Sequence, residues 1–309
     1  MSNNNENTPN KRKKGPGRPR KNPPKKEIPR HGIAQEPNDI DDVVEFIYSI
    51  PIIMKKIIVF FKNLSAAQIQ ILFRKEDIIF YALDHHEESK IRVRIDGKKL
   101  NHYYCKKEVN IGVNCKELEL ILNKVDKEYN SIFMMLTKGK TQEHITLFME
   151  NEIEIEETHI IDLIGQYKQI TADEERDFCD EDYTVKFKMP GKYFRKLIND
   201  IKTISTELSF IQDDKREPLE LSYISKNKKV RSKHIIKNSK HIKLYSKLSS
   251  NDTFRVTVKL DSIKPISSAH IADELVLLVD ENRKFMTKAL LDNGAIEIKT
   301  LTNIIDQRI

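Results

Sequence analysis

The stretch that decides the fold is Ile52-Ile53-Met54-Lys55-Lys56-Ile57-Ile58-Val59-Phe60-Phe61-Lys62-Asn63-Leu64. Ile53, Ile57, Phe60, Phe61 and Leu64 follow the i, i+4, i+7, i+8 spacing of one buried helical stripe. Lys55 and Lys62 are seven residues apart on the opposite side, and Lys56 lies beside them. The stretch therefore predicts a helix with one apolar face and one basic face.

Three more segments carry a similar stripe, and their spacing predicts a repeat. The expected helices run over about Cys115–Val125, over the residues from Pro190 to Lys202, and over about Asp261–Ala269, where Pro265 weakens the pattern. The first and third helices begin about 140 residues apart, and the second and fourth about 145. Between the helices we expect strands, among them Ile69–Phe73, Ile78–Leu83, Ile91–Ile95, Ser131–Leu136, Tyr183–Lys188, Leu275–Val279, Phe285–Leu291 and Ile296–Leu301. The pattern indicates an α+β protein built from two copies of one module.

Charge is segregated along the chain, although the net charge of the 309 residues is only +7. Residues 1–30 hold ten Lys and Arg against two Glu, and residues 150–182 hold thirteen acids against two basic residues. The rest of the chain is basic. Such segregation is typical of a protein with a polyanion on one surface and a different partner on another.

Several classes of protein are disfavoured by the composition. No apolar run approaches the roughly 20 residues that span a bilayer, and the amino terminus is not that of a signal peptide, so we expect an intracellular protein without a membrane segment. The three cysteines lack the paired spacing of a zinc site or disulfide framework. No Gly-rich phosphate loop, nucleophile elbow or clear metal-ligand set is present, so we expect no enzyme activity, no metal and no cofactor.

Three motifs resemble those of eukaryotic and viral sliding clamps of the proliferating cell nuclear antigen type. They are the opening stretch with its lysines, Ile111-Gly112-Val113-Asn114 ahead of the second helix, and Val185-Lys186-Phe187-Lys188-Met189-Pro190 ahead of the third. The basic leader and the Asp96-Gly97-Lys98-Lys99-Leu100-Asn101-His102-Tyr103-Tyr104 run resemble clamp-like proteins of large double-stranded DNA viruses. That origin implies a site of action in the host nucleus or at a cytoplasmic site of viral replication.

The resemblance implies two similar clamp domains in tandem, with helices on the inner face and antiparallel sheets outside, and three chains in a homotrimeric ring around double-stranded DNA. We expect a disordered basic tail over residues 1–42, a first domain over 43–164, an acidic connector over 165–182 and a second domain over 183–309. Strand edges near His144–Phe148 and Lys226–Arg231 are the expected places for ring closure.

The implied DNA contacts are basic residues of the inward-facing helices. A wall that allows sliding attracts phosphates without reading bases, and lysine suits this because it is a flexible point charge. The candidates are Lys55, Lys56, Lys62, Lys116, Lys124, Arg195 and Lys196. The alternative is that these side chains form ordinary solvated helix faces.

The implied second surface binds short peptides of DNA polymerases and other replication and repair proteins beneath the connector. Its apolar candidates are Leu83, Ile164, Ile170, Leu301 and Ile304. Acidity around Asp173–Asp182 would favour peptides with basic flanks.

The tail contains Lys14-Gly15-Pro16-Gly17-Arg18-Pro19-Arg20-Lys21, which resembles an AT-hook. Proline keeps such a segment extended, and Arg18 and Arg20 would enter the narrow minor groove of A·T-rich DNA. A nuclear localisation signal or a general polybasic arm remains an alternative.

Two other functions stay open at this point. One is an AT-hook chromatin or transcription factor with a dimerising body. The other is a nuclease whose catalytic acids lie within residues 150–182.

Overall fold

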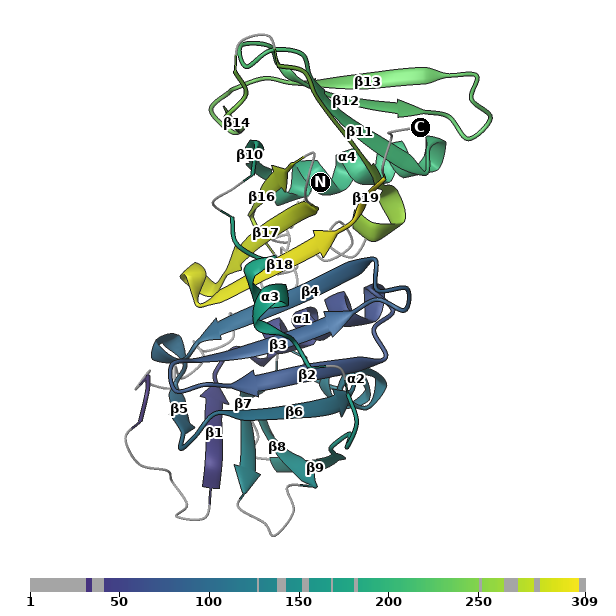
Figure 1. The fold of residues 1–309 in the computed structure, drawn as a ribbon. Helices are drawn as coiled ribbons and strands as arrows, with labels where there is room; N and C mark the ends of the chain where they lie inside the picture. The colour runs from purple at the N-terminus through teal and green to yellow at the C-terminus, as the bar shows by residue number, and fades with distance from the viewer. Residues whose placement is uncertain are drawn as a thin grey trace, which may run out of the picture.

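Apart from the short 3-10 helices and β19, the two halves of the chain contain the same order of helices and strands (Figure 1). The computed structural model describes residues 32–34, 42–126, 128–137, 143–151, 156–167, 169–180, 183–249, 252–263, 272–280 and 284–305. The first half comprises β1 (Asp42–Tyr48), α1 (Pro51–Asn63), β2 (Gln68–Phe73), β3 (Asp77–Leu83), β4 (Ser89–Asp96), η1 (Gly97–Lys99), β5 (His102–Cys105), β6 (Val109–Asn114), α2 (Cys115–Leu122), β7 (Tyr129–Thr137), β8 (His144–Asn151) and β9 (Glu156–Asp162).

The second half repeats this series after the short helix α3 (Ala172–Arg176). It comprises β10 (Val185–Pro190), α4 (Gly191–Ile204), β11 (Glu207–Gln212), β12 (Leu219–Ile224), β13 (Arg231–Ile236), β14 (Lys243–Ser246), β15 (Phe254–Lys259), helical residues 260–263, β16 (Glu274–Val279), β17 (Phe285–Leu291), η2 (Asp292–Gly294), β18 (Ile296–Thr302) and β19 (Ile304–Ile305). α1 and α4 begin 140 residues apart, so the predicted tandem α+β architecture is confirmed.

Strand pairing is also the same in both halves. The order β5-β1-β7-β8-β9 in the first half matches β14-β10-β16-β17-β18 in the second, and β6-β2-β3-β4 matches β15-β11-β12-β13. The halves are joined because β18 pairs antiparallel with β4, with Ile296 opposite Ile95 and Thr302 opposite Ser89. This pairing creates one nine-stranded sheet that crosses both halves.

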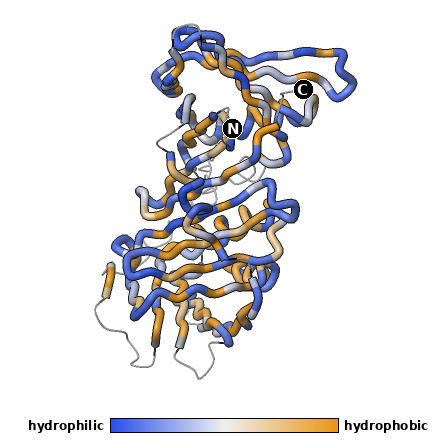
Figure 2. The backbone as a smooth tube through the Cα atoms, in the orientation of Figure 1, coloured by the Kyte–Doolittle hydropathy of each residue, from blue (hydrophilic) through white to orange (hydrophobic). Residues whose placement is uncertain are grey.

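The sheets and helices enclose a main hydrophobic core, and a smaller cluster lies under the connector. On the nine-stranded sheet, alternate side chains such as Phe80, Val93 and Ile298 pack into the main core with α1, α2 and α4. Tyr81 and Leu301 point to the opposite face and pack under the connector. Figure 1 shows α3 in front of this sheet and α1 behind it, and Figure 2 shows hydrophobic positions along its strands with hydrophilic residues at the turns. The long helices therefore share one face, and the connector covers the other.

The helix predictions were close, with small differences at the ends. α1 buries Met54 and Ile58 in addition to most of the predicted stripe, whereas Ile53 is only partly buried. α4 begins at Gly191, so Pro190 ends β10 instead of opening the helical turn. Leu260 and Ile263 of the predicted fourth helix are helical and buried, and the remainder from residue 264 to 269 lies outside the described residues.

Of the two predicted sheet edges, the one at His144–Phe148 was wrong, whereas the one near Lys226–Arg231 lies directly at the start of the edge strand β13. His144–Phe148 belongs to β8, which pairs on both sides with β7 and β9. Residues 226–230 form the turn before β13, which begins at Arg231. The edges of the two five-stranded sheets that matter here are β9 and β13. The acidic composition of β9 concealed it as a strand, because charged residues are depleted in strands.

Candidate nucleic-acid interface and partner surface

Lys55 holds the end of α2 in place. Its Nζ donates hydrogen bonds to the backbone oxygens of Asn123 and Val125, each at 2.7 Å. Asn123 is the C-cap of α2, where a helix has unsatisfied acceptors and a negative dipole end, and Val125 lies two residues beyond it. The ammonium of Lys55 is thus used within the chain, and its contact with DNA stays a prediction.

We expect Lys55→Met to lower the free energy of unfolding by about 1–2 kcal/mol, because it removes two charge-assisted hydrogen bonds to a helix end. Urea unfolding monitored by circular dichroism measures this change. Lys56→Met is the matched control, since Lys56 is exposed on the same helix, and it should change stability by less than about 0.5 kcal/mol. Equal effects of the two substitutions would contradict the capping role.

Two further candidate lysines also form ion pairs within the first half. Lys62 Nζ lies 2.5 Å from Glu119 Oε1 on α2, and Lys124 Nζ lies 3.3 Å from Glu157 Oε2 on β9. The hydrogen bond from Lys62 lowers the pKa of Glu119 below its ordinary value. Both lysines keep about half of their side-chain surface exposed, 56% and 51%, so these pairs are weak and leave the amines accessible to a phosphate.

The remaining candidates differ in exposure. Lys56, Lys116 and Lys196 are exposed on α1, α2 and α4, whereas Arg195 is half-buried. α1 and α2 pack beside each other, which brings the candidates of the first half onto one helical layer. Arg18 and Arg20 lie outside the described residues. The exposed lysines come from both halves of the repeat, as an inward-facing basic wall requires.

The Gly-Val-Asn motif ahead of α2 has a local physical explanation. Asn114 caps the helix, since its side-chain oxygen accepts a hydrogen bond from the Lys116 amide at 2.9 Å. A Cβ on Gly112 would lie 2.4 Å from the ring of Tyr167, which packs directly on this strand. The motif therefore combines a helix start with a close contact to the beginning of the connector.

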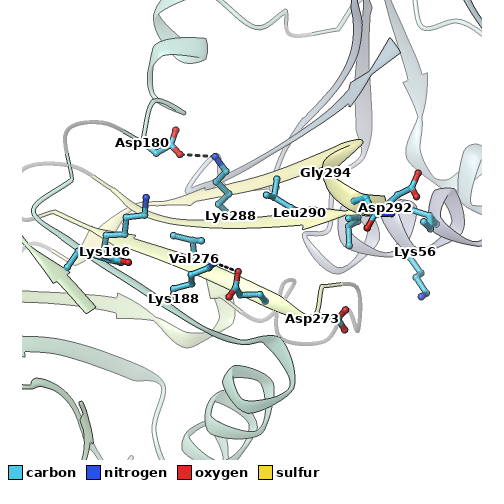
Figure 3. Close-up of a pocket in the computed structure, with 15 residues that line it drawn as sticks. Lys56, Asp180, Lys186, Lys188, Asp273, Val276, Lys288, Leu290, Asp292 and Gly294 are labelled. Carbon is cyan, nitrogen blue, oxygen red and sulfur yellow. Dashed lines mark hydrogen bonds and ion pairs between the residues drawn. The ribbon is translucent and has the colours of Figure 1, made fainter. Parts of the chain in front are cut away.

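The connector is bound to the outer face of the nine-stranded sheet by ion pairs. Glu174 and Glu175 pair with cations of the first half: Lys90 on β4 at 2.9 Å and Arg74 after β2 at 2.7 Å. Asp177 and Asp180 pair with cations of the second half: Asp177 with Lys284 at 2.9 Å, and Asp180 with Lys288 at 2.8 Å and Lys299 at 3.0 Å. Figure 3 shows the Asp180–Lys288 pair. The acidity that favoured basic peptide flanks in the sequence is thus largely neutralised within the chain.

Three of the five apolar partner candidates, two from the sheet and one from the connector itself, lie together where the connector meets the sheet. Leu301 is a buried member of the small cluster, and Leu83 and Ile170 pack against it. Ile304 lines a neighbouring pocket of about 600 Å³ with Tyr183 and Leu301. Ile164 lies apart from them, where its amide donates to the carbonyl of Gly112. A second pocket of about 210 Å³ is lined by Leu83, Tyr81 and Tyr167, the last at the start of the connector.

A larger pocket of about 940 Å³ lies between the second half and the start of α1. Figure 3 shows Lys186 and Lys188 on β10 beside Lys288 on β17, with Lys56 and Asp292 at the far end. Its four lysines are matched by four acids, and Lys188 pairs with Glu274 at 2.5 Å. No sequence pattern predicted a pocket at this place.

Comparisons with known proteins agree with this geometry. The family model of the proliferating cell nuclear antigen (PCNA) N-terminal domain matches residues 44–176. PCNA from Thermococcus kodakaraensis superimposes with a TM-score of 0.70 over 85% of this chain and 100% of that chain, at 13% sequence identity. The chain is PCNA-like in fold.

Viral relatives extend the similarity along the PCNA-like chain. Uncharacterised proteins of African swine fever virus, from the Pig/Kenya isolate and the Badajoz Vero-adapted strain, are each 28% identical over 95% of this chain and 98% of their own length. The predicted resemblance to clamp-like proteins of large DNA viruses is confirmed.

Two features of the described part of the PCNA-like chain bear on other functions. No helix there has the length and apolarity needed to cross a membrane. In the same residues, no group of three or more His, Cys, Asp and Glu side chains is arranged to hold a metal ion.

Proposed function

We propose that this chain is a DNA sliding clamp, a non-enzymatic scaffold whose copies close head to tail into a ring and hold polymerases and other proteins on duplex DNA. The observation that carries this proposal is the repeat of strand pairing. Within one chain, β18 of the second half pairs with β4 of the first half. Their counterparts, β9 in the first half and β13 in the second, both remain edge strands.

The same joint, repeated between chains, would pair β9 of one copy with β13 of the next. Each chain then offers one edge of each kind, so association is head to tail and continues until a ring closes. Transferring the β18–β4 register through the matching strands places Thr158 opposite Lys233 and Asp162 opposite Lys229. Three chains, as the family resemblance implies, would give six similar modules around the hole.

Charge and exposure at the two edges support this pairing. β9 carries Glu157 and Asp162, whereas β13 carries Arg231 and Lys233 and follows a turn with three lysines. Ile160 on β9 is 64% exposed, and Ile235 on β13 is 43% exposed. Exposed apolar side chains on unpaired edge strands favour association, and opposite charges select the β9–β13 combination over β9–β9 or β13–β13.

The helical layer is the proposed DNA-facing wall. Lys56, Lys116 and Lys196 are exposed there on three different helices. Scattered amines attract phosphates through long-range electrostatics without base readout, which permits movement along the duplex. The oppositely facing connector and its pockets provide a separate surface for partner proteins.

The tail is proposed to add a second, sequence-biased DNA contact. Deleting residues 1–30 should weaken binding to A·T-rich duplex more than to G·C-rich duplex, because Arg18 and Arg20 would read the narrow minor groove. Fluorescence anisotropy with the two duplexes measures the difference. Polymerase stimulation should persist, and its complete loss would show that the tail has a role in the ring or partner surface.

The mass in solution tests the ring directly. Light scattering coupled to gel filtration should give the mass of three 36.2 kDa chains. A stable dimer would instead support the alternative of a DNA-binding factor with a dimerising body.

A further inference from the structure

The apolar site beneath the connector is already filled by the connector itself. Phe178 is 1% exposed and packs in the small cluster with Tyr81, Tyr183, Leu278, Met286 and Leu301. Its ring meets Tyr81 edge to face with centroids 6.2 Å apart, and the guanidinium of Arg92 lies 5.7 Å from its centroid. These contacts are those of a preformed seat for an aromatic side chain.

Two pockets adjoin this seat. The pocket of about 210 Å³ shares Tyr81 with the seat, and the pocket of about 600 Å³ shares Tyr183 and Leu301 with it. The two pockets therefore each adjoin the seat of Phe178 through residues they share with it, and the seat with these two pockets is called the trough.

The lysines at the rim of the trough are poorly exposed and are paired with carboxylates of the connector. Lys299 has only 7% of its side chain exposed, and its Nζ donates to Phe178 O at 2.8 Å and to Asp180 at 3.0 Å. Lys90, at 13% exposure, pairs with Glu174. A ligand that displaced the connector without supplying acceptors would leave these ammonium groups desolvated and poorly paired, which is costly. Glu297, at 3.5 Å from Lys299, would remain beside that lysine.

Ionisation of the connector acids is consistent with tight docking. Burial by itself would raise the pKa of Asp180, but hydrogen bonds from Lys288 and Lys299 outweigh it and hold the pKa well below its usual range. Burial by itself would also raise the pKa of Glu174. Hydrogen bonds, of which the one from Lys90 has the largest effect, outweigh burial and lower the pKa below its ordinary value. The carboxylates stay charged at neutral pH.

We propose that residues 174–180 are a self-bound ligand of this trough, and that a partner peptide binds by replacing them with an aromatic anchor flanked by carboxylates. The aromatic ring takes the seat of Phe178, and the carboxylates take the places of Glu174 and Asp180 on Lys90 and Lys299. The proposal deepens the partner surface described above, on which it rests for its location. It reverses the preference for basic flanks that the sequence suggested.

The test uses a variant with the connector released and a synthetic probe. In the full-length chain, Phe178→Ala with Asp180→Asn removes the anchor and the main carboxylate of the connector. The probe is a fluorescein-labelled peptide with the sequence of residues 171–182 and Cys179→Ser. We expect the variant to bind this peptide at least ten times more tightly than the unmodified chain does, with affinity that falls as salt rises.

Matched peptides separate the two parts of the motif. A peptide with Phe178→Ala, and one with Glu174→Gln and Asp180→Asn, should each bind at least ten times more weakly. A peptide with its flanking acids replaced by lysines should not bind. Equal binding of the basic and acidic peptides, or undiminished binding after removal of the aromatic ring, would overturn the proposal.

Hydrogen exchange on the unmodified chain keeps the proposal testable if the variant does not fold. Saturating acidic peptide should raise exchange at residues 174–180, because the connector is displaced. Unchanged protection with peptide bound would overturn the proposal. Light scattering of the same samples measures the oligomer, which should be the same with and without peptide. It therefore distinguishes failure of the connector-displacement proposal from failure of the proposed clamp function.

Discussion

Substitutions that place like charges opposite each other across the proposed β9–β13 joint should leave the protein monomeric. Ile160→Lys on β9 would bring a cation against the basic edge of the next chain, and Arg231→Glu with Lys233→Glu on β13 would face the acidic edge. Like charges placed opposite each other cost several kcal/mol at an interface, so each change should weaken association by about a hundredfold or more. Light scattering reads the result as a fall from three chains to one.

Mixing the two monomeric variants tests the head-to-tail arrangement. The β9 variant keeps an intact β13 edge, and the β13 variant keeps an intact β9 edge, so an equimolar mixture should associate although neither variant associates alone. If each edge instead paired with the same edge of another chain, a variant with one altered edge would still dimerise alone through its unaltered edge. Dimers in either variant alone would contradict the proposed joint.

Reversing the charge of the exposed helix lysines should abolish most DNA binding while the ring remains intact. Lys56→Glu, Lys116→Glu and Lys196→Glu change three side chains that are exposed on α1, α2 and α4. Affinity for duplex should fall roughly tenfold or more, and the slope of log affinity against log salt should fall by about 0.9 for each phosphate that the protein no longer neutralises. Anisotropy titrations at several salt concentrations provide both quantities.

A control with the same charge change identifies the surface. Lys215→Glu, Lys237→Glu and Lys243→Glu reverse three exposed lysines on and around the strands of the second half. DNA affinity should change much less than with the helix variant, although long-range repulsion will lower it slightly. An equal fall in affinity for the two sets would show that binding follows net charge and that the helical layer has no special role.

The helices and the repeat were predictable because their signals are local. The stripe from Met54 to Leu64 and the capping Asn114 each act within one helix, and the 140-residue offset of α1 and α4 is visible in the sequence alone. The identity of the edge strands was not predictable, because an edge is defined by strands that fail to find a partner far along the chain. Residues 144–148 were predicted as an edge because β9, the strand that pairs with them, was not recognised in the sequence.

The candidate site was predicted in outline, but the contacts of its side chains were not. Lys55 and Lys62 look like free charges until α2 is placed beside α1, since their partners are 57 to 70 residues away. Phe178 lies within an acidic stretch that resembles a solvated linker. Its burial depends on cations such as Lys90 and Lys299, which are 84 residues from Glu174 and 119 from Asp180. Ion pairs between residues so far apart in the chain cannot be predicted from local sequence patterns.

Order-of-addition retention on linear duplex DNA tests the enclosed ring most directly, and it needs no loading factor. The protein is added to duplex with free ends, both ends are then blocked with a bulky protein, and the sample is washed at high salt. An enclosing ring should be retained in this order, retained little when the ends are blocked first, and released when they stay free. Retention that is the same in all three cases would contradict enclosure of DNA.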